Sequence, residues 1–309
     1  MIAQNLENSE SVIEIERVTR AFGKKMALGE ISLSVPRGVV FGLVGANGAG
    51  KTTLIRHVLG LLKAQQGLVR VFGRDPVADP VGVLSRVGCL SEENDLPGWM
   101  RVGELMRYTQ AFYPGWDETY AEELRRAFAL DPSVRVKHLS KGQRARAGLL
   151  IALAYRPELL VLDEPSSGLD PIVRRDILGA IVRTIADEGR TVLFSSHLLD
   201  EVERVSDHVA MLDQGRLAFA GAMDDIKQTH HRLTLVFAEA RREPPALQGV
   251  LAWEGAGRQW TALVSGRLAE LRVAAIGQGA QVVDERPPSL DEIFVAQVGA
   301  IRTTAEEVS

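Results

Sequence analysis

Residues 45–52 read Gly-Ala-Asn-Gly-Ala-Gly-Lys-Thr, which matches the G-x-x-x-x-G-K-[ST] pattern of a phosphate-binding loop. The apolar run 39–44 precedes this loop and an expected helix from residue 53 follows it, so the motif has the strand–turn–helix setting it requires. Glycines let the backbone approach phosphates, and the helix N-terminus directs its amides and positive dipole end at them. Lys51 is expected to reach the β- and γ-phosphates, and the Thr52 hydroxyl to bind Mg²⁺. The stretch predicts nucleotide binding; a chance match is the alternative, and the flanking strand and helix make it rarer.

The composition is that of an ordinary globular protein. The chain has 309 residues, 46% hydrophobic and 25% charged, which suggests one sizeable domain and a smaller one. Its formal net charge of −4 argues against a protein that coats nucleic acid. Cys89 is the single cysteine, which excludes an internal disulfide and is consistent with a reducing cytosol. Because its neighbours are apolar, we expect Cys89 to be a small buried side chain rather than a reactive thiol.

Neither a signal peptide nor a membrane span is indicated by the sequence. The polar and acidic residues 5–10 lack the basic region and apolar core of a signal peptide, and no stretch approaches 18 uncharged apolar residues. We therefore expect a cytoplasmic protein that reaches a membrane only through a partner.

The first part of the chain, residues 1–225, predicts an α/β core. Strands at 159–162 and 191–194 are joined by a helix at 174–188, and this βαβ order is typical of a parallel sheet. The helix after the phosphate loop is expected to end near Leu62, and the helical spacing between about 93 and 156 predicts a helical subdomain. The other expected strands are 12–18, 31–35, 67–73, 87–90, 208–212 and 216–219, with a turn at 22–25.

Residues 226–309 predict a small, separate α+β domain. Its expected strands are 232–237, 250–253, 260–264 and 281–283, and its expected helices are 268–276 and 290–298. The second and third strands are joined through Gly255-Ala256-Gly257. We expect Trp253 and Trp260 to be core residues or a cross-strand pair rather than a platform for a ligand.

Four further motifs resemble those of one family. Residues 159–165 (Leu-Leu-Val-Leu-Asp-Glu-Pro) look like a Walker B strand, and 139–143 (Leu-Ser-Lys-Gly-Gln) resemble the signature motif L-S-G-G-Q. Residues 167–170 (Ser-Gly-Leu-Asp) match the D-loop, and Ser195-Ser196-His197 matches the switch histidine. With the phosphate loop, these motifs make residues 12–222 similar to the nucleotide-binding subunit of an ATP-binding cassette (ABC) transporter. The resemblance implies a P-loop NTPase core of the ABC ATPase type, with a mixed sheet and a helical subdomain.

The resemblance also implies which residues do the chemistry. Glu164 would polarise the attacking water as general base, while Lys51 and His197 would act on the γ-phosphate. A carboxylate at the end of a buried strand can hold Mg²⁺, so Thr52 and Asp163 are the expected metal ligands. The expected ATP-binding residues are Phe22, Gly45, Asn47, Gly48, Ala49, Gly50, Lys51, Thr52, Thr53, Ser140, Gly142, Gln143 and Asp170.

Each motif taken alone has a simpler explanation. Two acids at a strand end can be a solvated pair, a serine before a helix can be an ordinary cap, and a histidine at a strand end is usually structural. Phe22 supplies a π-face for adenine but can equally belong to the core.

Two positions depart from the family pattern. Lys141 replaces the usual glycine of the signature, and it is open whether it touches nucleotide or faces solvent. Glu92 stands where the family often has glutamine. We hypothesise that Glu92 joins the Mg²⁺ shell; a solvated acidic loop is the alternative.

The resemblance implies two protein partners. Leu96, Trp99 and Met100 are large apolar residues in the loop where the family receives its membrane subunit, so we expect a multi-span transmembrane subunit to dock there; local core is the alternative. Because one chain holds every catalytic motif, a homodimer with ATP between the subunits is the simplest assembly. No nucleic-acid partner is expected.

The expected function is therefore ATP hydrolysis that powers a transporter from the inner face of the cell membrane. Lys141, Ser167 and the ending 288–294 resemble ATPase subunits of bacterial exporters with a separately encoded membrane subunit. One alternative is a soluble ATPase of the same superfamily that acts in DNA repair or on ribosomes. The sequence argues against this alternative, because no long coiled coil interrupts the two nucleotide motifs and no second cassette follows. Another is a regulatory binding module with slow turnover, against which Glu164 and His197 argue.

Overall fold

The computed structural model describes residues 11–93, 95–186 and 189–297. The chain forms two compact units, Met1–Ala220 and Gly221–Ser309. No helix of the described residues is long and apolar enough to cross a lipid bilayer.

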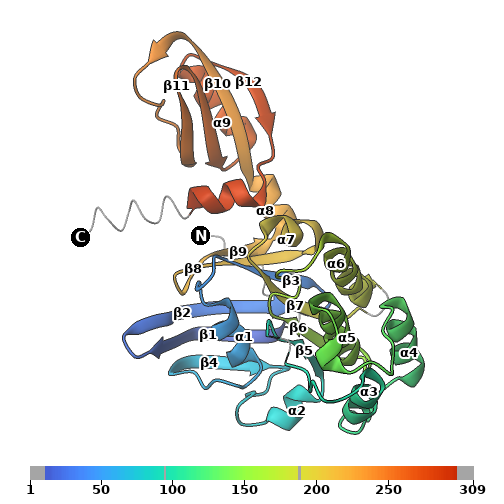
Figure 1. The fold of residues 1–309 in the computed structure, drawn as a ribbon. Coiled ribbons are helices and arrows are strands. Elements are labelled where there is room, and N and C mark those ends of the chain that lie inside the picture. The colour runs from blue at the N-terminus through green and yellow to red at the C-terminus, as the bar shows by residue number, and fades with distance from the viewer. Residues whose placement is uncertain (1–10, 94, 187–188, 298–309) are drawn as a thin grey trace. The chain divides into compact units, whose positions relative to one another are not determined.

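A six-stranded sheet forms the centre of the first unit, in the order β5-β6-β7-β3-β8-β9 (Figure 1). From β5 to β8 the neighbouring strands run parallel. All residues of β3 and β6 are buried, which is why these strands read as continuous apolar runs rather than alternating ones. The bounds are β3 (Val40–Val44), β5 (Val87–Leu90), β6 (Leu159–Leu162), β7 (Thr191–Ser196), β8 (His208–Asp213) and β9 (Arg216–Ala222).

A second sheet is antiparallel, in the order β2-β1-β4. Its strands are β1 (Ser11–Phe22), β2 (Lys25–Pro36) and β4 (Gln66–Val71), and the expected turn at residues 23–24 joins the first two. One apolar core contains side chains of this sheet, of β3 and of helix α1 (Lys51–Val58). The helix ends four residues before the expected Leu62 because Gly60 takes the left-handed conformation, with φ +70°.

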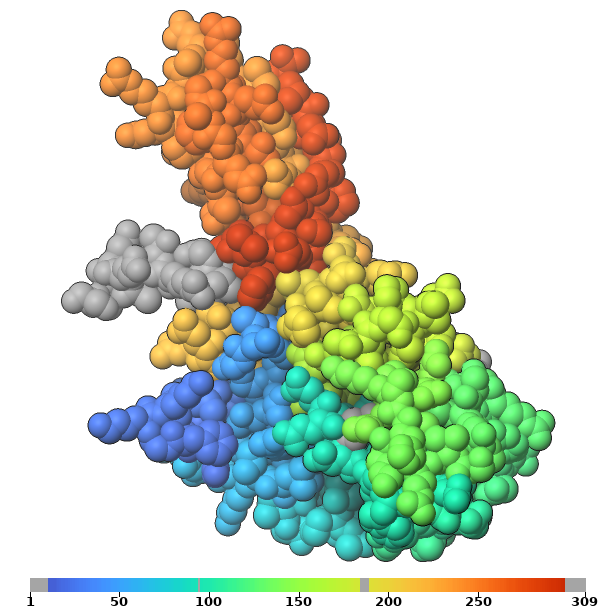
Figure 2. All heavy atoms as spheres, in the orientation of Figure 1, coloured from blue at the N-terminus to red at the C-terminus, as the bar shows by residue number. Residues whose placement is uncertain are grey.

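The expected helical subdomain is present in the stretch of chain between β5 and β6. It consists of α3 (Val102–Gln110), α4 (Glu118–Ala127), the 3₁₀ turn η1 (Val136–His138) and α5 (Lys141–Leu153). Figure 2 shows these helices, in teal to green, gathered at one side of the first unit.

Two of the three apolar residues expected to dock a partner belong instead to the core of this subdomain. Met100 is 4% exposed and packs with Leu105 and Val136, and Leu96 packs against this cluster. The prediction that Met100 lies on a docking surface is therefore wrong, because its side chain fills the space between α3 and η1. Trp99 alone of the three is exposed, at 71%.

The structure also contains elements that the sequence pattern did not predict. Helices α2 (Pro80–Leu84) and α7 (Leu199–Val205) have five and seven residues, too few for a clear helical period. Helix α6 (Pro171–Ala186) begins three residues before the expected Arg174. The carboxylate of Asp170 accepts hydrogen bonds from the backbone N–H groups of Ile172 and Val173 and so caps the helix at Pro171.

Cys89 is exposed, so the expectation of a buried thiol is wrong. Its strand, β5, is an edge strand of the six-stranded sheet, and the other three residues of the strand, Val87, Gly88 and Leu90, are buried. Apolar neighbours in sequence therefore do not bury Cys89, because an edge strand has a neighbouring strand on one side only.

The second unit is a three-stranded antiparallel sheet in the order β11-β10-β12 with helices beside it (Figure 1). Its elements are α8 (Met223–Thr229), β10 (His230–Arg241), β11 (Val250–Ser265), α9 (Leu268–Gly277), β12 (Ala280–Arg286) and helical residues 290–297; the expected helix end at Val298 lies outside the described residues. Strand β11 doubles back near Gly255, since the Ser265 N–H donates to the Gly249 carbonyl, so both expected strands are present. Trp260 is buried and Trp253 packs edge-on against it, with ring centres 6.2 Å apart, which confirms the expected pair.

Helix α7 lies directly on β3 at Gly42. A Cβ atom added to Gly42 would lie 2.3 Å from Cγ1 of Val202 and 2.7 Å from Oγ of Ser206. Both neighbours are buried, so neither has space to withdraw. Gly42 is thus required for the close approach of α7 to the strand that carries the phosphate loop.

We expect Gly42→Ala to lower the free energy of unfolding of the first unit by about 1–3 kcal/mol, the usual effect of overpacking a core. Urea unfolding followed by circular dichroism measures this change. Gly179→Ala in α6 is the control, because its Cβ would have only an ordinary contact at 3.5 Å with the Arg183 side chain. Equal unfolding midpoints for the two variants would contradict the packing argument.

Candidate active site

The candidate site residues lie at one edge of the six-stranded sheet. The strands β5, β6, β7 and β3 are consecutive neighbours and parallel, so their carboxyl ends meet at the same edge. Glu92 follows β5, Asp163 and Glu164 follow β6, His197 follows β7, and the loop 45–52 follows β3. Four segments far apart in sequence are thereby brought together.

The loop 45–52 has the backbone that phosphate binding needs. Gly50 is the N-cap of α1 with φ +109°, and a Cβ there would lie 2.7 Å from the Ala27 carbonyl oxygen. A Cβ on Gly45 would lie 2.3 Å from the carbonyl oxygen of Leu212, so both positions require glycine. Asn47 and Gly48 are exposed, and the first turn of α1 contains no acidic residue. The amides at this helix end therefore face an open position that favours an anion.

Lys51, Glu164 and His197 form a cluster in which the lysine and glutamate side chains are buried and the imidazole is exposed. Nζ of Lys51 lies 3.0 Å from Oε1 of Glu164, and each side chain is 5% exposed. Nδ1 of His197 donates to the other carboxylate oxygen at 2.7 Å, and the Lys51 ammonium donates to the Gly45 carbonyl at 2.7 Å. The two buried charges, on Lys51 and Glu164, compensate each other, as burial requires. A phosphate in the loop would attract Lys51 and leave Glu164 oriented by His197.

Glu164 also has an unusual backbone. Its φ is +48°, in the left-handed region that residues other than glycine rarely adopt. Such conformations persist where the surroundings impose them, and they are frequent at functional sites. Here the Glu164 N–H donates to Oγ of Ser195 at 2.9 Å, which helps to hold the conformation.

Asp163 is held beside Glu164 by the same serine. Oγ of Ser195 donates to Oδ1 of Asp163 at 2.7 Å. The Asp163 carboxylate and the Thr52 hydroxyl are hard oxygen ligands at the same sheet edge, and Mg²⁺ commonly takes one or two such protein ligands together with phosphate oxygens. The donor set therefore fits Mg²⁺, and these two residues would hold it.

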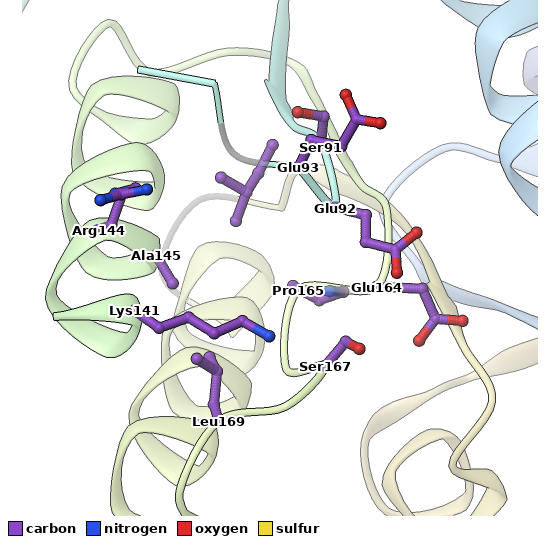
Figure 3. Close-up of a pocket in the computed structure, with 11 residues that line it drawn as sticks. Ser91, Glu92, Glu93, Lys141, Arg144, Ala145, Glu164, Pro165, Ser167 and Leu169 are labelled. Carbon is purple, nitrogen blue, oxygen red and sulfur yellow. The ribbon is translucent and has the colours of Figure 1, made fainter. Parts of the chain in front are cut away.

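Glu92 borders a cavity of about 210 Å³ that Glu164 also lines. Figure 3 shows the two carboxylates beside each other, with Lys141 and Arg144 of α5 across the cavity. Glu92 is exposed, so it is both solvated and next to the candidate general base.

The signature residues lie at the N-terminus of α5. Oγ of Ser140 accepts from the Gln143 N–H, and Oε1 of Gln143 accepts from the Ser140 N–H, which is a capping box. Gly142 is needed for packing, because a Cβ there would lie 2.8 Å from Cγ2 of Val173. The Lys141 side chain extends toward the loop that carries Ser167 and Leu169 (Figure 3). A Cβ added to Gly168 would lie 2.4 Å from its Nζ. Lys141 is therefore exposed but placed against the segment 167–170 of its own chain.

Phe22 is 47% exposed at the end of β1, so the alternative that it belongs to the core is wrong. The guanidinium carbon of Arg20 lies 4.9 Å from the centre of its ring. The ring is accessible for stacking.

Some residues of the site were missed by sequence reasoning. Ser195 stands inside the switch motif, but only the fold shows that its hydroxyl joins Asp163 to Glu164. Glu201 on α7 is buried and had no motif to identify it. Of the histidines to which no role was assigned, His57 and His230 are buried, and burial lowers the pKa of both rings.

Comparisons with known proteins agree with this geometry. Residues 28–167 match the ABC transporter family. The uncharacterized ABC transporter ATP-binding protein YhaQ of Bacillus subtilis (strain 168) is 31% identical, over 94% of this chain and 99% of that protein. The daunorubicin resistance ATP-binding protein DrrA3 of Streptomyces coeruleorubidus is 33% identical, over 96% of this chain and 99% of that protein.

Solved structures share the fold. An ATP-binding subunit of an ABC transporter superposes with a TM-score of 0.65 at 29% identity, covering 70% of this chain and 92% of that one. A dimeric post-hydrolysis state of an ATP-binding cassette bound to ADP and Pi has a TM-score of 0.62 at 20% identity, and the superposition covers 68% of this chain and 98% of that one. The predicted α/β fold with a phosphate loop and a mixed sheet is confirmed.

Proposed function

Since this chain belongs to the ABC transporter family as an ATP-binding subunit, and is an ATPase of that family, we propose that it powers an exporter whose membrane-spanning part is a separate polypeptide. Similarity to a protein named for daunorubicin resistance supports the exporter proposal. The alternative of a soluble ATPase in DNA repair or on ribosomes has no comparable support among these relatives.

The observation that carries the proposal is the contact of the buried pair Lys51 and Glu164 with His197 at the mouth of the phosphate loop. Phosphoryl transfer needs little covalent help from the protein; it needs positioning and compensation of charge. A cation for the phosphates, a carboxylate to orient water and an imidazole to hold that carboxylate are all within contact distance.

In the proposed reaction, the amides of residues 45–53 and the Lys51 ammonium hold the phosphates of ATP. Glu164 accepts a hydrogen bond from the attacking water and takes its proton as the bond from the water oxygen to the γ-phosphorus forms and the bond from that phosphorus to the bridging oxygen breaks, with ADP leaving. His197 keeps Glu164 oriented and contacts the γ-phosphate. Thr52 and Asp163 would hold Mg²⁺, which would neutralise part of the phosphate charge. Phe22 offers its exposed ring to the adenine.

The proposed active form is a homodimer. Ser140, Gly142 and Gln143 make their hydrogen bonds and packing contacts around the first turn of α5, while the Ser140 side chain stays exposed. This helix end is therefore free to cover the nucleotide of a second copy, and Asp170 follows it at the same surface. One copy alone would leave the γ-phosphate uncovered, so hydrolysis would require the closed dimer.

Trp99 is the proposed contact to the membrane subunit. It is exposed while its neighbours Leu96 and Met100 anchor the loop in the core of the helical subdomain. A large apolar side chain on a firmly held loop is a suitable anchor for a partner, because it loses little conformational entropy on binding.

The first test is Glu164→Gln. We expect the turnover number to fall by about 10²–10⁴-fold, because the base is lost while the shape of the site remains. Binding of ATP should persist, and size-exclusion chromatography with light scattering should show an ATP-dependent dimer. The exposed Glu123→Gln on α4 is the control. Unchanged hydrolysis would exclude Glu164 as the base, and a variant that stays monomeric with ATP would exclude the dimer.

The second test concerns Glu92 and Mg²⁺. If Glu92 contributes to the metal shell, Glu92→Gln should raise the Mg²⁺ concentration for half-maximal hydrolysis roughly 10-fold, because one negative oxygen ligand is lost. Glu93→Gln, an exposed neighbour that lines the same cavity, is the control. The same Mg²⁺ dependence and the same rate in both variants would leave Glu92 as a solvated acid.

The third test concerns Trp99. Trp99→Ala should weaken binding to the membrane subunit by more than about 10-fold, as for a buried aromatic anchor, with hydrolysis by the isolated chain within about twofold of wild type. Trp99→Phe should retain most of the binding. The measurement is the fraction that sediments with membranes and is extracted together with a multi-span protein. Equal sedimentation of all three chains would remove Trp99 from the contact.

A further inference from the structure

Glu201 is a buried carboxylate at the junction of four segments. It lies on α7 and is 2% exposed. Oγ of Ser166 donates to its Oε2 at 2.6 Å and Oγ of Ser196 at 3.3 Å, while Nε of Arg174 lies 3.0 Å from its Oε1. These partners come from the segment after β6, the end of β7 and helix α6.

The helix that carries Glu201 is itself firmly placed. Its neighbour Val202 is completely buried and packs against Gly42 of β3, where no other residue fits. Glu201 is therefore held at a fixed position relative to the strand that leads into the phosphate loop.

Each serine whose hydroxyl donates to Glu201 belongs to a segment of the candidate site. Ser196 precedes His197, and its Oγ also accepts from the Leu198 N–H at 3.0 Å, so its position determines the turn that presents the imidazole. Ser166 stands two residues after Glu164 and begins the segment that leads to Ser167 and Asp170. One carboxylate thus joins the turn of His197 to the segment 166–170.

The charge of Glu201 is compensated by one cation and two neutral donors. A buried carboxylate needs such partners, and removing a partner of a buried ion pair is strongly unfavourable. The glutamine variant keeps an oxygen that can accept from a serine but gives up the attraction to Arg174. It therefore separates the positioning role of the charge from the volume of the side chain.

We propose that Glu201 is a positioning residue that couples His197 to the segment 166–170, so that the γ-phosphate contact and the proposed dimer contact adjust together. The proposal rests on the proposed function of the site. Glu201 does not touch nucleotide or water; it acts through Ser196 on one side and through Ser166 and Arg174 on the other.

The test compares Glu201→Gln with Asp200→Asn, an exposed acid on the same helix turn. We expect Glu201→Gln to lower kcat roughly 10- to 100-fold, the usual effect of misplacing a catalytic group by a fraction of an ångström to one ångström. The Kd for ATP of the monomer should stay within about twofold of wild type, since the phosphate loop is unchanged. Asp200→Asn, the control, should have the wild-type kcat and the wild-type Kd for ATP. A merely structural role would weaken ATP binding and kcat together.

A second measurement is a double-mutant cycle with Ser196, and if Glu201→Gln folds poorly, an unchanged kcat of Ser196→Ala alone overturns the proposal. Ser196→Ala removes one hydroxyl and should lower kcat in the wild-type background but not further in Glu201→Gln, because both act through the same contact. Full additivity of the two effects, or a kcat of Glu201→Gln within about twofold of wild type, overturns the proposal.

The two hypotheses fail in different ways. If wild type hydrolyses ATP and Glu164→Gln does not, while Glu201→Gln equals wild type, only the role of Glu201 is wrong. If wild type and Glu164→Gln have the same hydrolysis rate, the proposed function of the site fails and the role of Glu201 fails with it.

Discussion

The parallel alignment of β5, β6, β7 and β3 is the constraint on which the site depends. Parallel strands need crossover connections, which here include the helical subdomain and α6, and these connections return the chain to the same end of the sheet each time. The loops after the strands therefore meet at one edge, although the first and last of them are more than a hundred residues apart. Any arrangement that reversed one strand would move its catalytic residue to the opposite edge.

The site concentrates charged groups in a region that is otherwise apolar. Lys51, Asp163 and Glu164 are buried beyond the ends of strands whose own residues are buried, and Glu201 is buried on α7. Such groups are stable only when they compensate one another, and removing one leaves another uncompensated. The contacts of Ser195 and of Ser166 and Ser196 show how this is done: short hydroxyls fill the remaining acceptor positions of the carboxylates without adding charge. The cluster is thus specified as a unit rather than residue by residue.

The sequence was most informative where a motif carries its own physical mechanism. The phosphate loop, the acids after β6 and the histidine after β7 could be assigned from the sequence, because glycine spacing and an apolar strand ahead of a polar residue are local properties. It was least informative for short helices and for burial. Helix α7 has seven residues, so its period is not visible, and with it Glu201 escaped notice. Met100 and Trp99 are adjacent apolar residues, yet one is core and the other exposed.

The amino-acid sequence by itself determined the class of fold, the order of the strands and of the longer helices along the chain, and the residue types able to hold a nucleotide, because these follow from periodicity and from spacing within short segments. The tertiary structure alone decided that Cys89 is exposed, that Met100 is core, that Lys141 lies against Gly168, and that Glu201 joins two loops of the site. The physical reason is that burial and compensation of charge depend on which distant segments pack together, and the sheet order sets this only when the whole chain has folded.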